Sequence, residues 1–229
     1  VKFVAYYPYN ADVRNFNYPV QLAAQERGST ACDLLYAATK EEYTYSPENE
    51  PHISLNFTHR LAKVILKFVN MEKEPLEVSD VRIEGMQTAA SFNIQTDVLT
   101  VDESSVATIN PYHNATTGFY EAIILPSALT DSYKVSFVLD DREKEWIFTN
   151  LDIALPQFHK GYSYTFALYI DDSGFVEMGR LENVEGGNSS APWEDGSSED
   201  GTAEGDKTPV SGYAVTPADG TQQALADTE

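Results

Sequence analysis

The sequence is poor in cysteine and in basic residues. The first shortage excludes an internal disulfide, and the second disfavours anionic binding partners. Cys32 is the single cysteine among 229 residues, so the chain cannot form a disulfide with itself. Lysine and arginine total 15 against 36 aspartates and glutamates, which gives a net charge of −21. So acidic a chain is repelled by phosphate backbones and by anionic lipid headgroups. We therefore expect neither nucleic-acid binding nor electrostatic binding to a membrane.

Long apolar runs are also missing. No stretch reaches the roughly 18 apolar residues of a membrane-spanning helix, and no secretory signal pattern opens the chain. The sequence begins at Val1, inside an apolar, strand-like run that extends to Tyr7. Because a natural start rarely falls in the middle of a strand, we expect the chain to be a fragment or a processed product.

Motifs of catalysis and metal binding are absent from the sequence as well. It has no Gly-Lys-Ser/Thr phosphate loop, no His-Glu-x-x-His and no Gly-x-Ser-x-Gly. No histidine lies three to five residues from another, as a local metal-ligand pair requires. The acidic clusters at 171–172 and 194–200 lack the alternating acids and distal glutamate of an EF-hand loop. We expect no enzyme activity, no cofactor and no metal site.

Two single residues admit a chemical and a structural interpretation. Cys32 could be a nucleophile, but the sequence indicates no partner histidine, and burial as a small apolar side chain is favoured. His59 lies between Phe57 and Leu61 on an inward-facing parity. This position favours a hydrogen-bonded core histidine over a catalytic base, because no acid or nucleophile is close to it in the sequence.

Strand signals dominate the chain. Apolar side chains alternate with a period of two over residues 133–139 and 162–170, which predicts strands with one buried face. A charged turn at 140–145 leads into an apolar return strand, which predicts a β-hairpin. Another strand is predicted over 119–125, where it ends before Pro126, a residue without an N–H donor. Many short strands of this kind predict an all-β fold of sandwich type.

The alternation of apolar and polar residues changes its phase within residues 52–69. The inward positions are odd-numbered up to Leu61 and even-numbered from Val64 to Phe68. A slip of one residue would turn buried side chains to solvent. We therefore expect a β-bulge or a short break near Ala62, with a strand segment on each side.

Helix signals are sparse and confined to the first 40 residues. Residues 21–27 form a plausible short helix, followed by Gly28 as a C-cap. The pattern over residues 33–39 is ambiguous between helix and strand.

Changes in composition divide the chain into three parts. The polar break at 72–75 predicts a boundary between an N-terminal β-sandwich domain over 1–72 and a second one over 73–185. From residue 186 onward, Gly, Ser and acidic residues prevail, and such a segment buries too little apolar surface to offset its ordering entropy. We expect a disordered acidic tail over 186–229. Residues 209–217 interrupt it with an apolar island flanked by prolines.

Seven short segments carry a further signal when they are taken in order. They are FVAYYPY (3–9), DLLYA (33–37), LNFTHRLAKV (55–64), ASFNI (90–94), AIILP (122–126), FHKGYSY (158–164) and PW (192–193). Each is weak alone, but the ordered set resembles the fimbrillin family of Gram-negative anaerobes, in particular its Mfa-like branch of pilus subunits. The resemblance covers residues 1 to about 193.

The resemblance implies two tandem transthyretin-like β-sandwich domains, the first of them incomplete here. It also implies a secreted lipoprotein, displayed at the outer membrane surface as a fimbrial subunit whose partners are other pilus subunits. Family members polymerise by strand exchange: a protease removes an N-terminal strand, and a strand of the next subunit fills the groove. The family's first strands and lipid-attachment cysteine are absent from this sequence, and Cys32 is not that cysteine. Membrane attachment would use an anchor outside this chain.

The apolar island at 209–217 is our candidate donor strand, with Val210, Tyr213 and Val215 as its anchors. The alternative is a tail that is disordered throughout.

A second function remains open, namely a surface lipoprotein that binds a glycan or a host ligand without polymerising. Aromatic side chains line sugar sites, although tyrosine is equally a strand former. The tyrosines concerned are Tyr6, Tyr7, Tyr9, Tyr43 and Tyr45.

Overall fold

A computed structural model describes residues 1–25, 28, 31–44, 52–70, 77–128, 133–139 and 157–170, together with the backbone of strands 144–149, 176–180, 194–195 and 216–217. Apart from a single 3₁₀ residue, Ala31, the regular structure in these residues is strand. The fold is therefore all-β, as predicted. No helix in the described part is long and apolar enough to cross a membrane.

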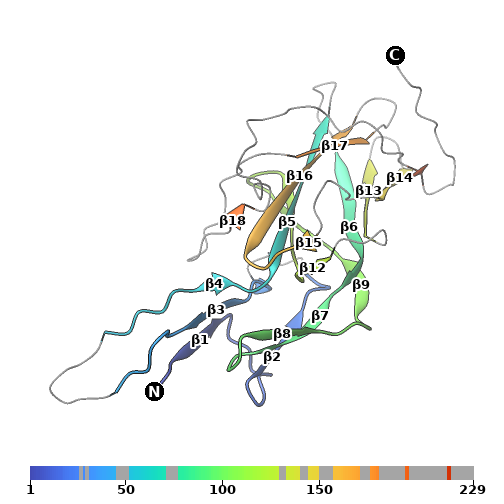
Figure 1. Cartoon of the computed structure of the whole chain (residues 1–229). Coiled ribbons are helices and arrows are strands. Elements are labelled where there is room, and N and C mark those ends of the chain that lie inside the picture. The colour runs from blue at the N-terminus through green and yellow to red at the C-terminus, as the bar shows by residue number, and fades with distance from the viewer. Residues whose placement is uncertain are drawn as a thin grey trace.

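Two facing sheets form the larger part of the molecule, which we call the large lobe (Figure 1). The strands of the first sheet are β5 (Ala62–Asn70), β10 (Tyr112–Asn114), β11 (Phe119–Ile124), β16 (Tyr162–Ile170), β17 (Val176–Arg180) and β18 (Glu194–Asp195). Their order is β10-β11-β5-β16-β17, and β18 also pairs with β16. The strands of the second sheet are β6 (Val78–Gln87), β9 (Val106–Ile109), β13 (Lys134–Leu139), β14 (Lys144–Thr149) and β19 (Thr216–Pro217). Their order is β19-β14-β13-β6-β9.

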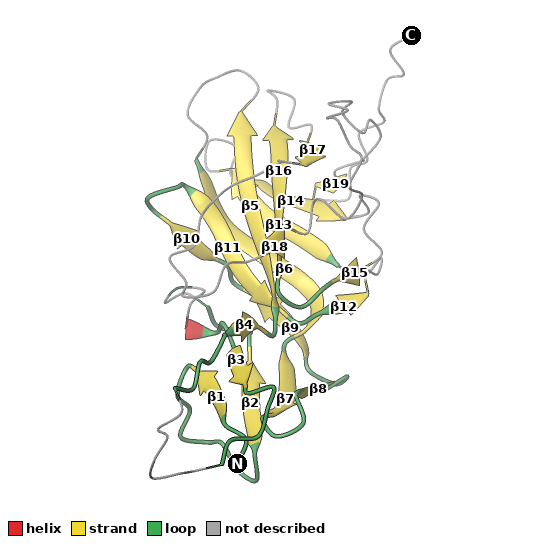
Figure 2. Ribbon diagram, turned by 60° about the vertical axis from the view of Figure 1, so that its left-hand side comes forward, coloured by secondary structure: helices red, strands yellow, loops and turns green. Residues whose placement is uncertain are grey.

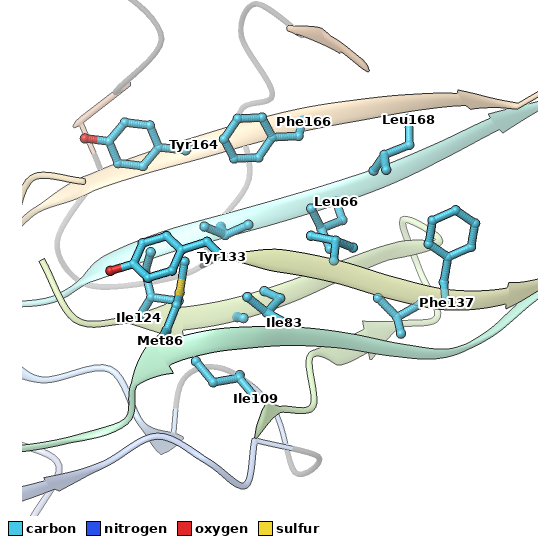
Figure 3. Packing of buried hydrophobic residues seen from close by; sticks show 14 of the residues in the cluster. Leu66, Ile83, Met86, Ile109, Ile124, Tyr133, Phe137, Tyr164, Phe166 and Leu168 are labelled. Carbon is cyan, nitrogen blue, oxygen red and sulfur yellow. The ribbon is translucent and has the colours of Figure 1, made fainter. Parts of the chain in front are cut away.

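The core of the large lobe lies between these two sheets. Figure 3 shows Phe166 on β16 and Leu66 on β5 on one side, with Ile83 on β6 and Phe137 on β13 on the other. All four side chains are almost fully buried. Removing a large aromatic side chain from such a packed position costs about 3–5 kcal/mol.

Strand β16 differs from its prediction in one respect, because both of its faces are buried. Thr165 and Ala167 have the parity predicted to face solvent, yet both are buried along with Tyr164 and Phe166. Strand β16 lies inside a mixed sheet, where it pairs in parallel with β5 over eight residues and antiparallel with β17. Strands inside parallel sheets are commonly buried on both faces, and alternation of side chains does not reveal this.

Two three-stranded sheets form a second, smaller part, which we call the small lobe (Figure 2). One sheet holds β1 (Val4–Tyr7), β3 (Leu35–Ala38) and β4 (Thr58–His59), in the order β1-β3-β4. The other holds β2 (Asn17–Gln21), β7 (Ala89–Asn93) and β8 (Val98–Val101), in the order β2-β7-β8. The rings of Tyr36 and Phe92 pack edge to face in the core of this lobe, with their centroids 5.3 Å apart. The remaining strands, β12 (Ser127–Ala128) and β15 (Gln157–Phe158), pair as a two-stranded ribbon.

One long hairpin runs through both lobes. Strand β6 of the large lobe continues past Thr88 into β7, and β8 returns into β9. At the crossing point the Ser105 hydroxyl accepts hydrogen bonds from the N–H groups of Thr88 and Ala89, at 3.2 and 3.0 Å. The two lobes therefore share backbone ladders, which is a stiffer connection than a single linker.

Gln25 makes a second connection between the lobes. Its carboxamide donates to the Ile123 carbonyl at 2.6 Å and accepts from the Ile123 N–H at 2.7 Å. The pairing of β10 with β11 stops at Glu121, so the Gln25 amide continues the ladder beyond it. Gln25 is 1% exposed.

The helix predicted over 21–27 is wrong for residues 21–25, because Gln21 ends β2 and Ala24 forms a bridge with Asn110. Residues 26–27 lie outside the described part. The ambiguous 33–39 segment contains strand β3. The hairpin of β13 and β14 and the break between β4 and β5 are confirmed.

The predicted domain boundary at 72–75 stays a prediction, because residues 71–76 lie outside the described part. Strand β5, which precedes it, pairs with β11 and β16, which follow it.

Candidate functional site

Strand β1 forms one edge of the small lobe, and no described strand pairs with its outer side (Figure 1). The Phe3 carbonyl accepts from the Thr39 N–H at 2.9 Å, so Phe3 faces the neighbouring strand. Hydrogen-bonding groups alternate in direction along an antiparallel strand, so those of Ala5 and Tyr7 face β3 as well. The N–H and C=O groups of Val4 and Tyr6 consequently point to the open side. Such an edge is a template for another strand.

Exposed large apolar side chains are concentrated in the first 20 residues of the chain. The large hydrophobic residues that are exposed in the described part before residue 20 are Val1, Phe3, Val4, Tyr7, Tyr9 and Phe16. Beyond residue 20 only Val98 and Val106 join them in that part. Tyr7 is 54% and Tyr9 83% exposed. An open edge beside exposed apolar side chains is a liability that soluble proteins usually cover.

The inner side of β1 is firmly held. The ring of Tyr6 packs edge to face on the ring of Tyr18, with the centroids 5.6 Å apart. Burial raises the pKa of the Tyr18 hydroxyl. Before the strand begins, the Val1 amine donates to the Tyr43 carbonyl at 2.7 Å, and Phe3 contacts the Tyr43 ring. The segment is thus fixed in place along one side while its other side is open.

The local charge differs from the overall charge. Residues 1–9 contain Lys2 and no acidic residue, in a chain whose net charge is −21. A strand that approaches β1 therefore meets no carboxylate within that segment. An acidic molecule of the same kind is not repelled by the segment itself.

The predicted donor residues Val210, Tyr213 and Val215 lie outside the described residues. The last two positions of the same apolar island, Thr216 and Pro217, form β19. They pair antiparallel with Ile147 and Trp146 of β14. Figure 2 shows β19 in the large lobe, beside β14, and β1 in the small lobe.

His59 is a hydrogen-bonded core histidine, as predicted. Its Nδ1 lies 2.8 Å from Asp33 Oδ1, and both side chains are buried. Asp33 was not predicted as its partner because 26 residues separate the two. The register of β3 and β4 brings them together, since Leu35 lies opposite His59. The pair joins β4 to the segment that leads into β3.

A second buried polar group lies on the first sheet of the large lobe. Lys63 Nζ and Glu121 Oε2 are 2.7 Å apart, and the Asn114 amide donates to the other oxygen of Glu121 at 2.9 Å. Each charge is paired, as burial requires, and breaking such a pair costs more than the pair contributes. The arrangement ties together strands β5, β10 and β11.

Neither Cys32 nor the acidic residues of the described part favour a nucleophilic or metal-binding site. Cys32 is partly buried beside the small-lobe core, and burial raises the pKa of its thiol, with the nearby Asp33 adding to the effect. A raised pKa leaves less thiolate, so nucleophilicity is low. Within the described residues, no group of three His, Cys, Asp or Glu side chains could hold a metal ion.

Comparison with known protein families gives a match over residues 1–193, to the family described as fimbrillin-like. The chain belongs to the fimbrillin-like family. Among curated proteins nothing matches. Membership of this family supports a structural, non-enzymatic protein of pilus type at the cell surface.

Solved structures share the fold of this fimbrillin-like chain. A candidate cell adhesion protein of Bacteroides uniformis superposes with a TM-score of 0.67 at 24% identity, covering 79% of this chain and 71% of its own. A second candidate cell adhesion protein, from Bacteroides ovatus, superposes with a TM-score of 0.64 at 16% identity, covering 81% of this chain and 69% of its own. At these identities the likeness concerns the fold.

Sequence reasoning identified residues 1–7 as a strand but missed that the strand forms an exposed edge. One signal was available. Val4, Ala5, Tyr6 and Tyr7 are all apolar or aromatic, whereas a strand with one face in solvent usually alternates.

Proposed function

We propose that this chain is an adhesive or structural subunit of a bacterial surface fimbria that assembles by strand addition. The open edge of β1, with exposed apolar side chains beside it, is the observation that carries the proposal. A strand added there satisfies the outward groups of Val4 and Tyr6 and covers Phe3 and Tyr7. Membership of the fimbrillin-like family supports the same role.

The incoming strand in this proposal is the apolar island of another subunit, residues 209–217, with Val210, Tyr213 and Val215 as anchors. The island ends in β19, which pairs with β14 of its own chain, so part of this segment already takes strand geometry. The described end of the island, β19, lies in the large lobe and the acceptor β1 in the small lobe (Figure 2), an arrangement that suits head-to-tail assembly. Attachment to the outer membrane would use a lipid anchor outside this chain.

Electron microscopy of cells that express the full-length gene with its neighbours tests this proposal. Deletion of residues 208–229 should abolish fibres that contain the subunit, because the donor is removed. Val4→Pro should also abolish them, since proline lacks the N–H that the incoming strand needs. Val4→Ala is the matched control, because it keeps the N–H and removes only part of an exposed side chain.

Fibres that persist after the deletion would rule out the donor role of 209–217. Fibres that persist in Val4→Pro would rule out β1 as the acceptor. Loss in Val4→Ala as well would mean that the side chain matters more than the ladder. Labelling along the fibre length would indicate a shaft subunit, and labelling at the ends a tip or anchor.

A surface lipoprotein that binds a glycan or a host ligand without polymerising is the second candidate. The exposure of Tyr7, Tyr9 and Phe16 favours it, because aromatic rings stack on the apolar faces of sugars. A glycan array probed with the purified chain tests this candidate. Binding that is lost in Tyr9→Ala while fibres are unaffected would support it, and an array without hits would count against it.

A further inference from the structure

The sequence of the open edge strand has an unusual symmetry about Ala5. Phe3 and Tyr7 are both aromatic, Val4 and Tyr6 are both apolar or aromatic, and the small Ala5 lies between them. If two such strands paired antiparallel about Ala5, each residue would therefore lie opposite a residue of the same apolar or aromatic class. We propose that two copies of this chain pair β1 to β1 about a two-fold axis at Ala5, which joins their β1-β3-β4 sheets into one continuous sheet.

The backbone of β1 fits this pairing. Its outward-facing groups belong to Val4 and Tyr6, as the hydrogen bond from Thr39 to Phe3 establishes. A two-fold axis at Ala5 places Val4 opposite the partner's Tyr6, and Tyr6 opposite the partner's Val4. Each of these two pairs exchanges two N–H···O=C bonds. Pro8, which has no N–H, ends the ladder on each side.

The side chains fit the same register. Phe3 then lies opposite the partner's Tyr7, and Tyr7 opposite the partner's Phe3, in pairs without backbone hydrogen bonds. Side chains approach most closely in such pairs, and aromatic pairs there stabilise a sheet. Ala5 meets its own copy on the axis, where a small residue is accommodated. Phe3 and Tyr7 are 39% and 54% exposed in the single chain, so both have surface left to bury.

The charge of residues 1–9 does not oppose this contact. The area of the interface determines how strong the dimer is. Residues 1–9 carry Lys2 and no carboxylate, so all 36 acidic side chains lie elsewhere in the chain. An interface of one short strand is small, so the dimer should be weak and should form reversibly with concentration. The dimer does not depend on a pilus role. It covers the edge that we assign to the donor strand, so the dimer and the fibre exclude each other at β1.

Sedimentation velocity of the full 229-residue chain over a range of concentrations tests the dimer. Phe3→Lys and Tyr7→Glu should each weaken self-association about tenfold, because each substitution breaks both aromatic pairs. The double variant should restore it, since opposite charges then face each other across the axis. Within one chain these positions are four residues apart, roughly 13 Å along a strand, so the restoration cannot arise inside a single copy.

A disulfide tests the register independently. In a pairing about Ala5 only residue 5 faces its own copy, with the Cα atoms about 4.5 Å apart, within the range of a disulfide. In a Cys32→Ser background, Ala5→Cys should cross-link two chains under mild oxidation. Tyr7→Cys is the matched control and should cross-link poorly, because it faces the partner's Phe3.

Three results would overturn the inference: a chain that is monomeric at every concentration, a double variant that stays as weak as the single ones, or equal cross-linking of the two cysteine variants. Deletion of residues 208–229 distinguishes the dimer from the donor strand. The dimer should survive this deletion while fibres are lost. A dimer lost with the tail would show that the tail occupies the edge instead.

Discussion

Gln25 shows how much a single buried side chain contributes to this fold. Its carboxamide is bound to both backbone groups of Ile123, and it also donates to the Leu22 carbonyl at 2.8 Å. It therefore completes a ladder that β10 leaves unfinished and connects the segment after β2 to the large lobe. A buried polar side chain with every group satisfied contributes to a unique arrangement of the lobes.

Gln25→Leu should lower the free energy of unfolding by about 2–4 kcal/mol, because the Ile123 N–H and C=O would be left buried without partners. Urea denaturation of the full chain measures this change. Gln95→Leu is the matched control, because Gln95 is exposed, and its stability should stay close to that of the parent. An equal loss in both variants would contradict the assigned role of Gln25.

Prediction from the sequence was least complete for the contacts of individual residues. The buried state of His59 followed from the parity of its neighbours, but its partner Asp33 did not, because β-sheet register joins residues that are far apart in the chain. Gln25 was predicted within a helix, since nothing in the local pattern marks a side chain that binds another strand.

Turn Arg14–Asn17 illustrates strain at the scale of an element. Asn15 and Phe16 have φ angles of 49° and 62°, and Arg14 and Asn17 exchange two backbone hydrogen bonds around them. Two-residue hairpin turns with both central φ angles positive favour Asn-Gly. Phe16 occupies the position where glycine is expected, and the residue is 57% exposed.

Phe16→Gly should raise the free energy of unfolding by about 0.5–1 kcal/mol, because relief of the left-handed conformation outweighs the added chain entropy. Phe16→Ala is the control, since alanine removes the ring but keeps the Cβ atom that causes the strain. Thermal and urea unfolding compare the two variants. A glycine variant less stable than the alanine variant would mean that the added chain entropy of glycine costs more than the relief of strain gains.

Strands were predicted well where alternation was regular, as in β13 and β16, and where an apolar run ended at a proline, as in β11. Strand β6 was harder to predict because it contains two irregularities. Its register shifts against β13 near Asp80, whose φ is 48°, and against β9 near Gly85, whose φ is 85°. Bulges of this kind bend a strand and break its period, so a pattern of two is lost in the sequence.

At the scale of the whole molecule, two lobes are joined by shared strands, and an open edge lies on the small one. The all-β class and the fimbrillin-like family were predictable from the sequence, because both depend on patterns repeated over many residues. Which strand forms an edge was not predictable, since this depends on the order of strands in a sheet. The edge at β1 becomes visible only when β3 is found on one side of it alone.

Amide hydrogen exchange along β1 tests the central claim most directly. In the dilute single chain, the Val4 and Tyr6 amides should exchange rapidly, while those of Ala5 and Tyr7 are protected by β3. Addition of a peptide with the sequence of residues 209–217 should slow exchange at Val4 and Tyr6 by at least about a hundredfold, as a new ladder forms. Protection of Val4 and Tyr6 in the single chain, or rapid exchange with saturating peptide, would contradict the account.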